Sequence, residues 1–183
     1  VLQAQAHLFT IFAAIDVFDI EINEKDPDKF VDVVKSISTT FGGINLEDIK
    51  APEAFKIEKD LINQLDIPVM HDDQHGTAII SAAALLNALE LANKKIEDIK
   101  IVVSGAGAAA VACTNLYISF GAKLKNIVMT DSKGVIRTDR DNLTDEKKYF
   151  ATERNISSLE EAMVDSDVFI GLSMANIVSK EML

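Results

Sequence analysis

Two acidic pairs in this chain stand where metal chemistry would be expected. Glu47-Asp48 follows one short apolar run, and Asp72-Asp73 follows another that begins at Ile67. Both runs have the length and composition of buried β-strands, and a carboxylate at the end of such a strand must be solvated, paired or bound to a cation. Carboxylate oxygens suit Mg²⁺ or Mn²⁺ better than zinc. Glu47, Asp48 and Asp73 are therefore candidate ligands of a divalent cation, and Asp72 is expected to support them or to cap a helix.

Ordinary helix capping is the alternative for these carboxylates, because acidic residues also stabilise the helix N-termini that follow them. Three carboxylates that are far apart in the sequence need not meet. His71 and His75 flank the second pair, but their spacing is not a common zinc pattern. We predict local hydrogen bonds for both histidines. The only cysteine, Cys113, lies in an apolar helix and is expected to pack in the core.

A glycine-rich turn follows the predicted strand at 99–103. Its sequence is Gly105-Ala-Gly107-Ala-Ala-Ala110, and an apolar helix comes directly after it. In a Gly-x-Gly-x-x-Ala turn, the first glycine allows the tight bend, the second lets backbone approach a pyrophosphate, and the alanine permits close helix packing. This arrangement predicts a dinucleotide site. A glycine-rich turn that only packs against a neighbouring helix is the alternative.

The acidic residue at the end of the next strand bears on the choice of nucleotide. Asp131 is placed to accept the adenosine ribose hydroxyls, which favours NAD because a carboxylate repels a 2′-phosphate. Lys133 could offset that repulsion. A Lys at a turn is more commonly exposed to solvent without a ligand. The sequence therefore leaves the choice between NAD and NADP open.

Strands and helices alternate along the chain, which is typical of an α/β fold with largely parallel sheets. We predict a smaller α/β unit at 1–93 and a second unit at 94–183, which begins with the glycine-rich turn of a Rossmann-like nucleotide-binding domain. The helix from Gly76 to about Ala92 is apolar nearly all round and should be central and buried. A capping box is expected at Ser157 with Glu160. Strands are expected at 15–22, 44–46, 67–70, 99–103, 126–130 and 167–171. Further helices are expected at 27–37, from Pro52 and at 108–120. The polar stretch at 132–152 is expected to form a flap or an irregular insertion.

Composition excludes several classes of partner. The 183 residues carry a net charge of -11, which argues against nucleic acid and anionic membranes. No apolar run is long enough for a membrane span. A single cysteine fits the reducing cytoplasm. Both ends of the sequence lack the features of a natural terminus, so we expect a piece of a longer chain.

Taken together, these motifs resemble the bacterial-type malic enzymes over essentially the whole chain. The segments that carry the resemblance are Gly42-Gly-Ile-Asn-Leu-Glu-Asp-Ile49, Pro68-Val-Met-His-Asp-Asp-Gln-His-Gly-Thr-Ala78, Gly105-Ala-Gly-Ala-Ala-Ala110, Asp131-Ser-Lys-Gly134 and Phe169-Ile-Gly-Leu-Ser173. The family oxidises malate with NAD⁺ or NADP⁺ and decarboxylates it to pyruvate and CO₂. The resemblance implies that 1–93 is a substrate- and metal-binding domain and that 94–183 is the first half of a Rossmann-like nucleotide-binding domain. It implies Mg²⁺ or Mn²⁺ on Glu47, Asp48 and Asp73, and a homodimer or larger assembly. It also implies dinucleotide contacts from Thr77, Gly105, Ala106, Gly107, Ala108, Ala109, Asp131, Ser173 and Asn176.

One position departs from the family pattern. Members carry a catalytic Lys in a segment like Pro-Val-x-Gly-Lys-Ala-x-Leu-Phe, and Gln5 stands at that Lys in the matching residues 1–9. Glutamine cannot act as a general base. The family's catalytic Tyr and the second half of its nucleotide domain are expected outside these residues. Two other hypotheses therefore stay open: a non-catalytic nucleotide- and metal-binding module, and a different dehydrogenase built from two α/β domains.

Overall fold

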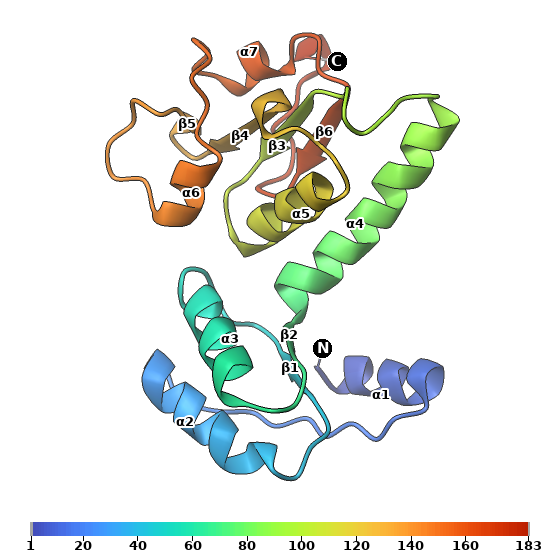
Figure 1. The fold of residues 1–183 in the computed structure, drawn as a ribbon, viewed down its shortest axis with the longest axis vertical. Coiled ribbons are helices and arrows are strands. Elements are labelled where there is room, and N and C mark those ends of the chain that lie inside the picture. The colour runs from blue at the N-terminus through green and yellow to red at the C-terminus, as the bar shows by residue number, and fades with distance from the viewer. Residues whose placement is uncertain (1, 183) are drawn as a thin grey trace.

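The computed structural model describes residues 2–182, with side chains from residue 6 onward. Two α/β parts follow one another along the chain, and one long helix connects them (Figure 1). The predicted α/β class is confirmed, with parallel strands in both parts. No helix within the described range is both long and apolar enough to cross a membrane.

The first part is a two-stranded parallel sheet with two of its helices packed on it. It contains α1 (Leu2–Ala13), α2 (Pro27–Ser38), β1 (Ile44–Leu46), α3 (Glu53–Gln64) and β2 (Val69–His71). Asp26 caps α2 because its carboxylate accepts hydrogen bonds from two backbone N–H groups of the first turn. The apolar faces of α2 and α3 pack against the sheet. Their shared core consists of Val31, Val34, Leu46, Ile57 and Leu61.

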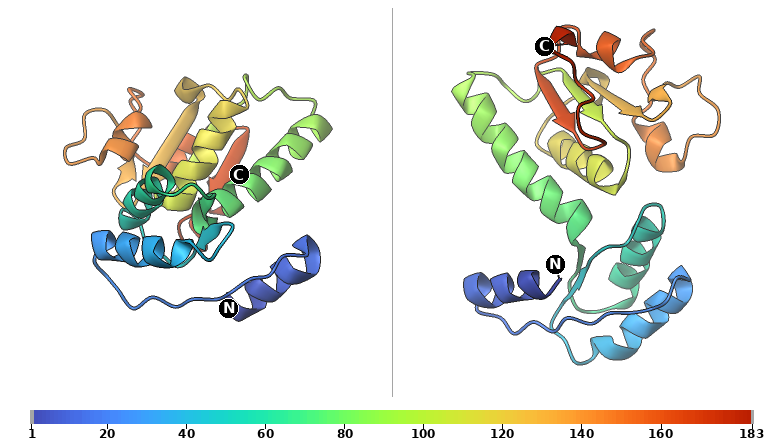
Figure 2. Two further views of the ribbon diagram at one scale, coloured as in Figure 1. Left: turned by 60° about the horizontal axis from the view of Figure 1, so that its bottom comes forward. Right: turned by 180° about the vertical axis from the view of Figure 1, so that it is seen from behind.

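The second part is a four-stranded sheet in the order β5-β4-β3-β6. The strands β3 (Ile101–Ser104), β4 (Ile127–Asp131) and β6 (Val168–Gly171) are parallel, and β5 (Gly134–Val135) pairs antiparallel with β4. The helix α5 (Ala108–Ser119) covers one face of this sheet, as Figure 2 shows. The helix α7 (Leu159–Met163) packs on the other face. The remaining short helices are η1 (Leu124–Asn126), α6 (Asp145–Tyr149) and η2 (Lys180–Met182).

The alternation of side chains along β3 and β4 explains this layering. Ile101 and Val103 point into the core shared with α5, whereas Val102 points into the core shared with α7. Successive strand residues face opposite sides of a sheet, so a continuous apolar run fills two cores. The strands β3 and β4 are therefore buried on both faces.

The connecting helix α4 (Asp72–Leu91) buries only one stripe of its surface, so the prediction of a helix buried all round is wrong. Ala78, Ala82, Leu85 and Leu89 pack into the core of the second part. Apolar side chains on the other faces are exposed, namely Ile79, Ile80, Leu86 and Leu91. Within the described residues α5 is the main neighbour of α4, and one neighbour can cover only one face of a helix.

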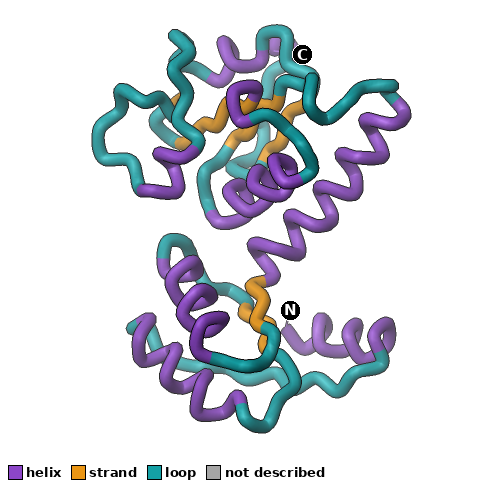
Figure 3. Tube along the Cα trace, in the orientation of Figure 1, coloured by secondary structure: helices purple, strands orange, loops and turns teal. Residues whose placement is uncertain are grey.

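Two further local predictions are wrong. Residues 14–26 form an extended loop with no strand at 15–22, as the tube in Figure 3 shows. Phe18 and Ile20 are exposed there, and alternation alone does not make a strand without a partner strand. The capping box lies one residue later than expected, because Ser158 caps α7 and pairs with Glu161. The polar stretch after β4 is an irregular loop that contains β5 and α6.

Candidate functional site

The register of the first sheet brings both acidic pairs to one edge. Strands β1 and β2 run parallel with Leu46 opposite His71, so Glu47-Asp48 and Asp72-Asp73 leave the sheet at the same end. Asp48 has a positive φ of 55°, which turns the chain away immediately after the strand. Asp73 lies in the first turn of α4, and half of its side-chain surface is exposed. Among residues 2–182, however, no three metal-binding side chains are close enough to form a complete cation site.

A buried carboxylate on α3 holds the junction between β2 and α4. Glu58 Oε1 accepts a 2.8 Å hydrogen bond from the backbone N–H of His71, and Glu58 Oε2 accepts one of 3.1 Å from Gln74 Nε2. His75 Nε2 lies 2.8 Å from Glu58 Oε1. The N-cap residue of α4 makes no side-chain capping bond, so Glu58 supplies from another helix the negative charge that a helix N-terminus favours.

The ring of His71 is fully buried at this junction. Neither ring nitrogen has a hydrogen-bond partner within the part of the chain that the structure describes. The nearest carboxylate oxygen is Asp73 Oδ2, at 4.0 Å from His71 Nε2. The prediction of local hydrogen bonds is therefore correct for His75 and wrong for the ring of His71. A buried imidazole without a partner is costly and calls for a functional explanation.

The glycine-rich turn has the close approach that its sequence predicts. Gly105 has a φ of 119°, and a Cβ there would lie 2.6 Å from the carbonyl oxygen of Leu172. Its N–H donates to the Thr130 carbonyl at 2.9 Å, which ties the turn to β4. Gly107 is the N-cap of α5 and has open space around it. Gly107 is also exposed, so the N-terminus of α5 is open to solvent at this residue, as anion binding at a helix N-terminus requires.

Replacing Gly105 with alanine should strain this turn, because the new methyl group would meet backbone at Leu172 and the φ is unfavourable for any other residue. We expect a stability loss of about 2 kcal/mol, the usual scale of such backbone strain. Thermal unfolding of the variant would measure it. Gly107→Ala is the matched control, since open space at Gly107 predicts a smaller loss. Equal losses in both variants would contradict this interpretation.

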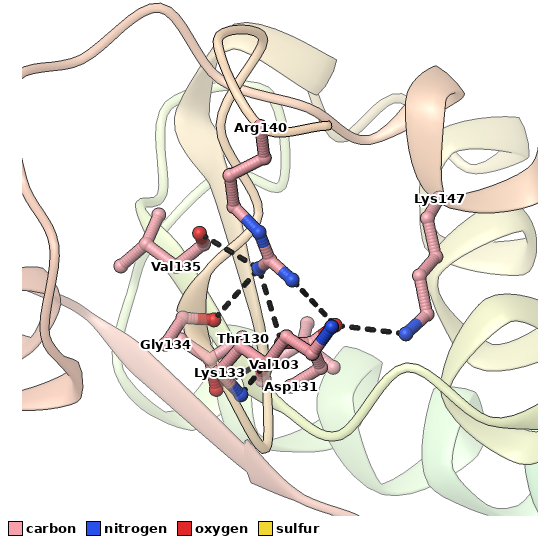
Figure 4. Close-up of polar contacts among 8 residues, drawn as sticks. All are labelled: Val103, Thr130, Asp131, Lys133, Gly134, Val135, Arg140 and Lys147. Carbon is pink, nitrogen blue, oxygen red and sulfur yellow. Dashed lines mark hydrogen bonds and ion pairs between the residues drawn. The ribbon is translucent and has the colours of Figure 1, made fainter. Parts of the chain in front are cut away.

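Asp131 ends β4, as predicted, but its carboxylate already has three partners. Arg140 donates two hydrogen bonds of 3.0 Å to its two oxygens, Lys147 Nζ donates one of 2.8 Å, and the Lys133 backbone N–H donates one of 2.9 Å (Figure 4). Burial alone would raise the pKa of Asp131, but the hydrogen bonds from Arg140 and Lys147 outweigh it and hold that pKa far below its ordinary value. These ion pairs stabilise the fold at neutral pH and are lost only as the pH falls through the depressed pKa.

The remaining residues of the predicted dinucleotide site lie at the glycine-rich turn, after β6 and on α4. Ala106, Ala108 and Ala109 line the turn and the first turn of α5, and all three are partly exposed. Ser173 follows β6, and its hydroxyl lies 2.8 Å from that of Ser104 on β3, beside the glycine-rich turn. Thr77 lies within α4, and Asn176 occupies an exposed turn with a φ of 58°. Gln5 lies within α1, but its side chain is outside the described residues.

Three residues at these sites were missed from the sequence: Glu58, Arg140 and Lys147. Arg140 and Lys147 lie in the polar stretch after Asp131, where no periodic pattern distinguishes them from solvated charges. Glu58 did leave a signal, because it is an acidic residue beside Ile57 and one turn from Ala54 and Leu61, the apolar positions that α3 buries. A charged residue at a buried position must have partners. Cys113, by contrast, is buried in the core as expected.

Comparison with known proteins identifies the family. The model of the malic enzyme NAD-binding domain matches residues 74–182, and the model of the malic enzyme N-terminal domain matches residues 23–62. The chain belongs to the malic enzyme family. Within that family it is similar to the NADP-dependent malic enzyme of Haemophilus influenzae, at 53% identity, and to an NAD-dependent malic enzyme of Rhizobium meliloti, at 52% identity. Both matches cover the whole chain but only 24% of the relative, so the chain spans about a quarter of their length.

Solved structures of malic enzymes share the fold. The NAD-dependent malic enzyme of Thermotoga maritima has a TM-score of 0.92 and 41% identity, over 98% of this chain and 49% of that one. The malic enzyme of Entamoeba histolytica has a TM-score of 0.91 and 38% identity, over 98% of this chain and 40% of that one. The predicted α/β fold, with parallel strands in a malic enzyme N-terminal part and a malic enzyme NAD-binding part, is thereby confirmed.

Proposed function

We propose that the full-length protein containing this chain catalyses the metal-dependent oxidative decarboxylation of malate to pyruvate and CO₂, with reduction of NADP⁺. The observation that carries the proposal is the parallel register of β1 and β2, which delivers Glu47, Asp48 and Asp73 to one edge. The three side chains do not meet among the described residues, so in this proposal the bound cation draws them together from that shared edge. Their hard oxygen donors suit Mg²⁺ or Mn²⁺.

In this proposal Glu47, Asp48 and Asp73 hold the metal. When bound, the cation supplies Lewis-acid chemistry that lowers the pKa of the malate hydroxyl and polarises the carbonyl formed from it. Asn45 Nδ2 donates to Glu47 Oε1 at 3.2 Å, which restrains one ligand from the preceding strand. The N-terminus of α5 and the turn from Gly105 to Ala109 bind the coenzyme pyrophosphate. Ser173 and Asn176 approach the coenzyme from the loop after β6, and Thr77 from α4.

The proposed preference for NADP⁺ rests on the charges around Asp131. Its carboxylate is neutralised by Arg140 and Lys147 together, so the cluster carries a net positive charge. A carboxylate engaged in this way is a poor acceptor for ribose hydroxyls and does not repel a 2′-phosphate. Its two cations can bind that phosphate instead. Lys133 adds a third positive charge next to the same strand end.

The test is an assay of the full-length protein for malate-dependent NADPH formation with Mn²⁺. Activity should disappear on treatment with a chelator and return with Mn²⁺ or Mg²⁺. Parallel reactions with NAD⁺ test the coenzyme preference separately. A folded full-length protein that oxidises no malate with either coenzyme would overturn the proposal.

Gln5 favours a second candidate, a non-catalytic nucleotide- and metal-binding module. The residue stands where the family pattern has a Lys, and an amide cannot take a proton from the substrate. Gln5→Lys in the full-length protein separates the two candidates. A large rate gain would indicate a disabled site, whereas an active wild-type protein would make the module untenable. A cytoplasmic location, a homodimer and a domain boundary at 93/94 remain predictions.

A further inference from the structure

The junction between β2 and α4 is held by one buried carboxylate, that of Glu58. Only about a tenth of the Glu58 side chain is exposed. Its partners are the His71 N–H, Gln74 Nε2 and His75 Nε2, at 2.8, 3.1 and 2.8 Å. These groups come from positions 71, 74 and 75. They therefore bracket Asp73 on both sides along the chain.

We propose that Glu58 is a positioning residue that fixes the first turn of α4 and so aims the Asp73 carboxylate at the metal. This inference rests on the proposed function, since it assigns Glu58 a role toward the cation that Asp73 would bind. Asp73 is itself half exposed, so little packing restrains its side chain. Its direction therefore depends on the backbone turn that carries it. Groups that hold metal ligands in place commonly change metal affinity 10- to 100-fold when they are removed.

The buried ring of His71 is an independent observation that points the same way. Its two nitrogens lack partners among the described residues, and Nε2 lies 4.0 Å from Asp73 Oδ2. A rotation of the exposed Asp73 carboxylate would bring the two atoms within hydrogen-bond distance. The backbone of the same histidine is held by Glu58. Glu58 thus restrains the Asp73 turn and the imidazole beside it.

Mn²⁺ binding to the full-length protein, measured by electron paramagnetic resonance of free Mn²⁺, tests the proposal without any turnover. Glu58→Gln keeps the shape of the side chain but replaces one carboxylate oxygen, a hydrogen-bond acceptor, with an NH₂ donor. That donor would face the N–H groups that now bond to Glu58. We expect the dissociation constant for Mn²⁺ to rise about tenfold. The KM for Mn²⁺ should rise with it, while kcat at saturating Mn²⁺ changes less than threefold. Gln74→Leu removes one donor and should give a smaller shift in the same direction.

Asp60→Asn is the matched control, because Asp60 lies on the same helix, pairs with Lys56 at 2.7 Å and, among the described residues, has no hydrogen bond or ion pair with the junction. Its Mn²⁺ affinity should stay within twofold of wild type. If Glu58→Gln and Gln74→Leu also stay within twofold while Asp73→Asn loses Mn²⁺, Glu58 only stabilises the fold and the positioning role is wrong. If Glu58→Gln does not fold, Gln74→Leu alone decides between these outcomes. If wild type binds no Mn²⁺, or Asp73→Asn binds it equally well, the proposed metal site fails and this inference fails with it.

Discussion

Replacing Asp73 with asparagine in the full-length protein is expected to lower kcat/KM for malate about 1,000-fold at a fixed Mn²⁺ concentration. That fall corresponds to about 4 kcal/mol at the usual 1.4 kcal/mol per tenfold. Asparagine keeps one oxygen but removes a negative charge from the proposed ligand set, and the cation contributes several kcal/mol to such reactions. Steady-state kinetics over a Mn²⁺ titration would measure the loss. Part of it should be recovered at high Mn²⁺.

Asp66→Asn provides the control for the same change of charge. Asp66 lies just before β2 and is exposed, at the opposite end of the strand from the acidic edge. Its replacement should leave kcat/KM within about twofold of wild type, as expected for a surface substitution. An Asp73→Asn enzyme with normal kinetics and normal metal dependence would show that this carboxylate only caps α4.

The second large effect is expected at the Asp131 cluster. Replacing Arg140 and Lys147 together with alanine should lower kcat/KM for NADP⁺ at least 100-fold and change the value for NAD⁺ less than fivefold. The variant would lose two charged hydrogen bonds that the wild type makes to the 2′-phosphate, each worth about 1.5–3 kcal/mol. In addition, Asp131 would lose both cations that neutralise it and would repel that phosphate. Coenzyme titrations with both nucleotides measure the change in preference.

Lys148→Ala combined with Arg154→Ala is the matched control. It also removes one Lys and one Arg from the region after β4. Neither contacts Asp131, because Lys148 pairs with Asp145 and Arg154 donates to the backbone carbonyl of Lys125. Coenzyme preference should not change in this variant. If the cluster variant loses NAD⁺ and NADP⁺ to the same extent, Arg140 and Lys147 support the fold of the β4 end and do not select the coenzyme.

The sequence predicted the elements whose signals are local. The helix that starts at Pro27, the continuous apolar run before Gly105 and the spacing of the glycines all depend on a few neighbouring residues, and the structure has each of them. Parallel pairing of β1 and β2 also followed from the strand-helix alternation. That pairing was enough to predict a shared edge for Glu47, Asp48 and Asp73.

The predictions that failed concern contacts made at long range. The segment at 15–22 alternates like a strand, but no local signal says whether a partner strand exists. The composition of α4 suggested a buried helix, yet burial depends on how many neighbours reach it. The partners of Asp131 come from 9 and 16 residues away, and Glu58 meets His71 across 13 residues. Such pairs carry no signal in residue spacing.

The ion-pair cluster at the end of β4 has a consequence for how salt affects coenzyme binding. The chain as a whole carries a charge of -11, so at low ionic strength its field repels an anionic coenzyme from a distance. Salt screens that repulsion beyond about 8 Å under physiological conditions. Arg140 and Lys147 are largely buried, with 19% and 27% of their side chains exposed, and interactions at that depth are screened much less. Moderate salt should therefore speed the approach of the coenzyme more than it weakens the final contact.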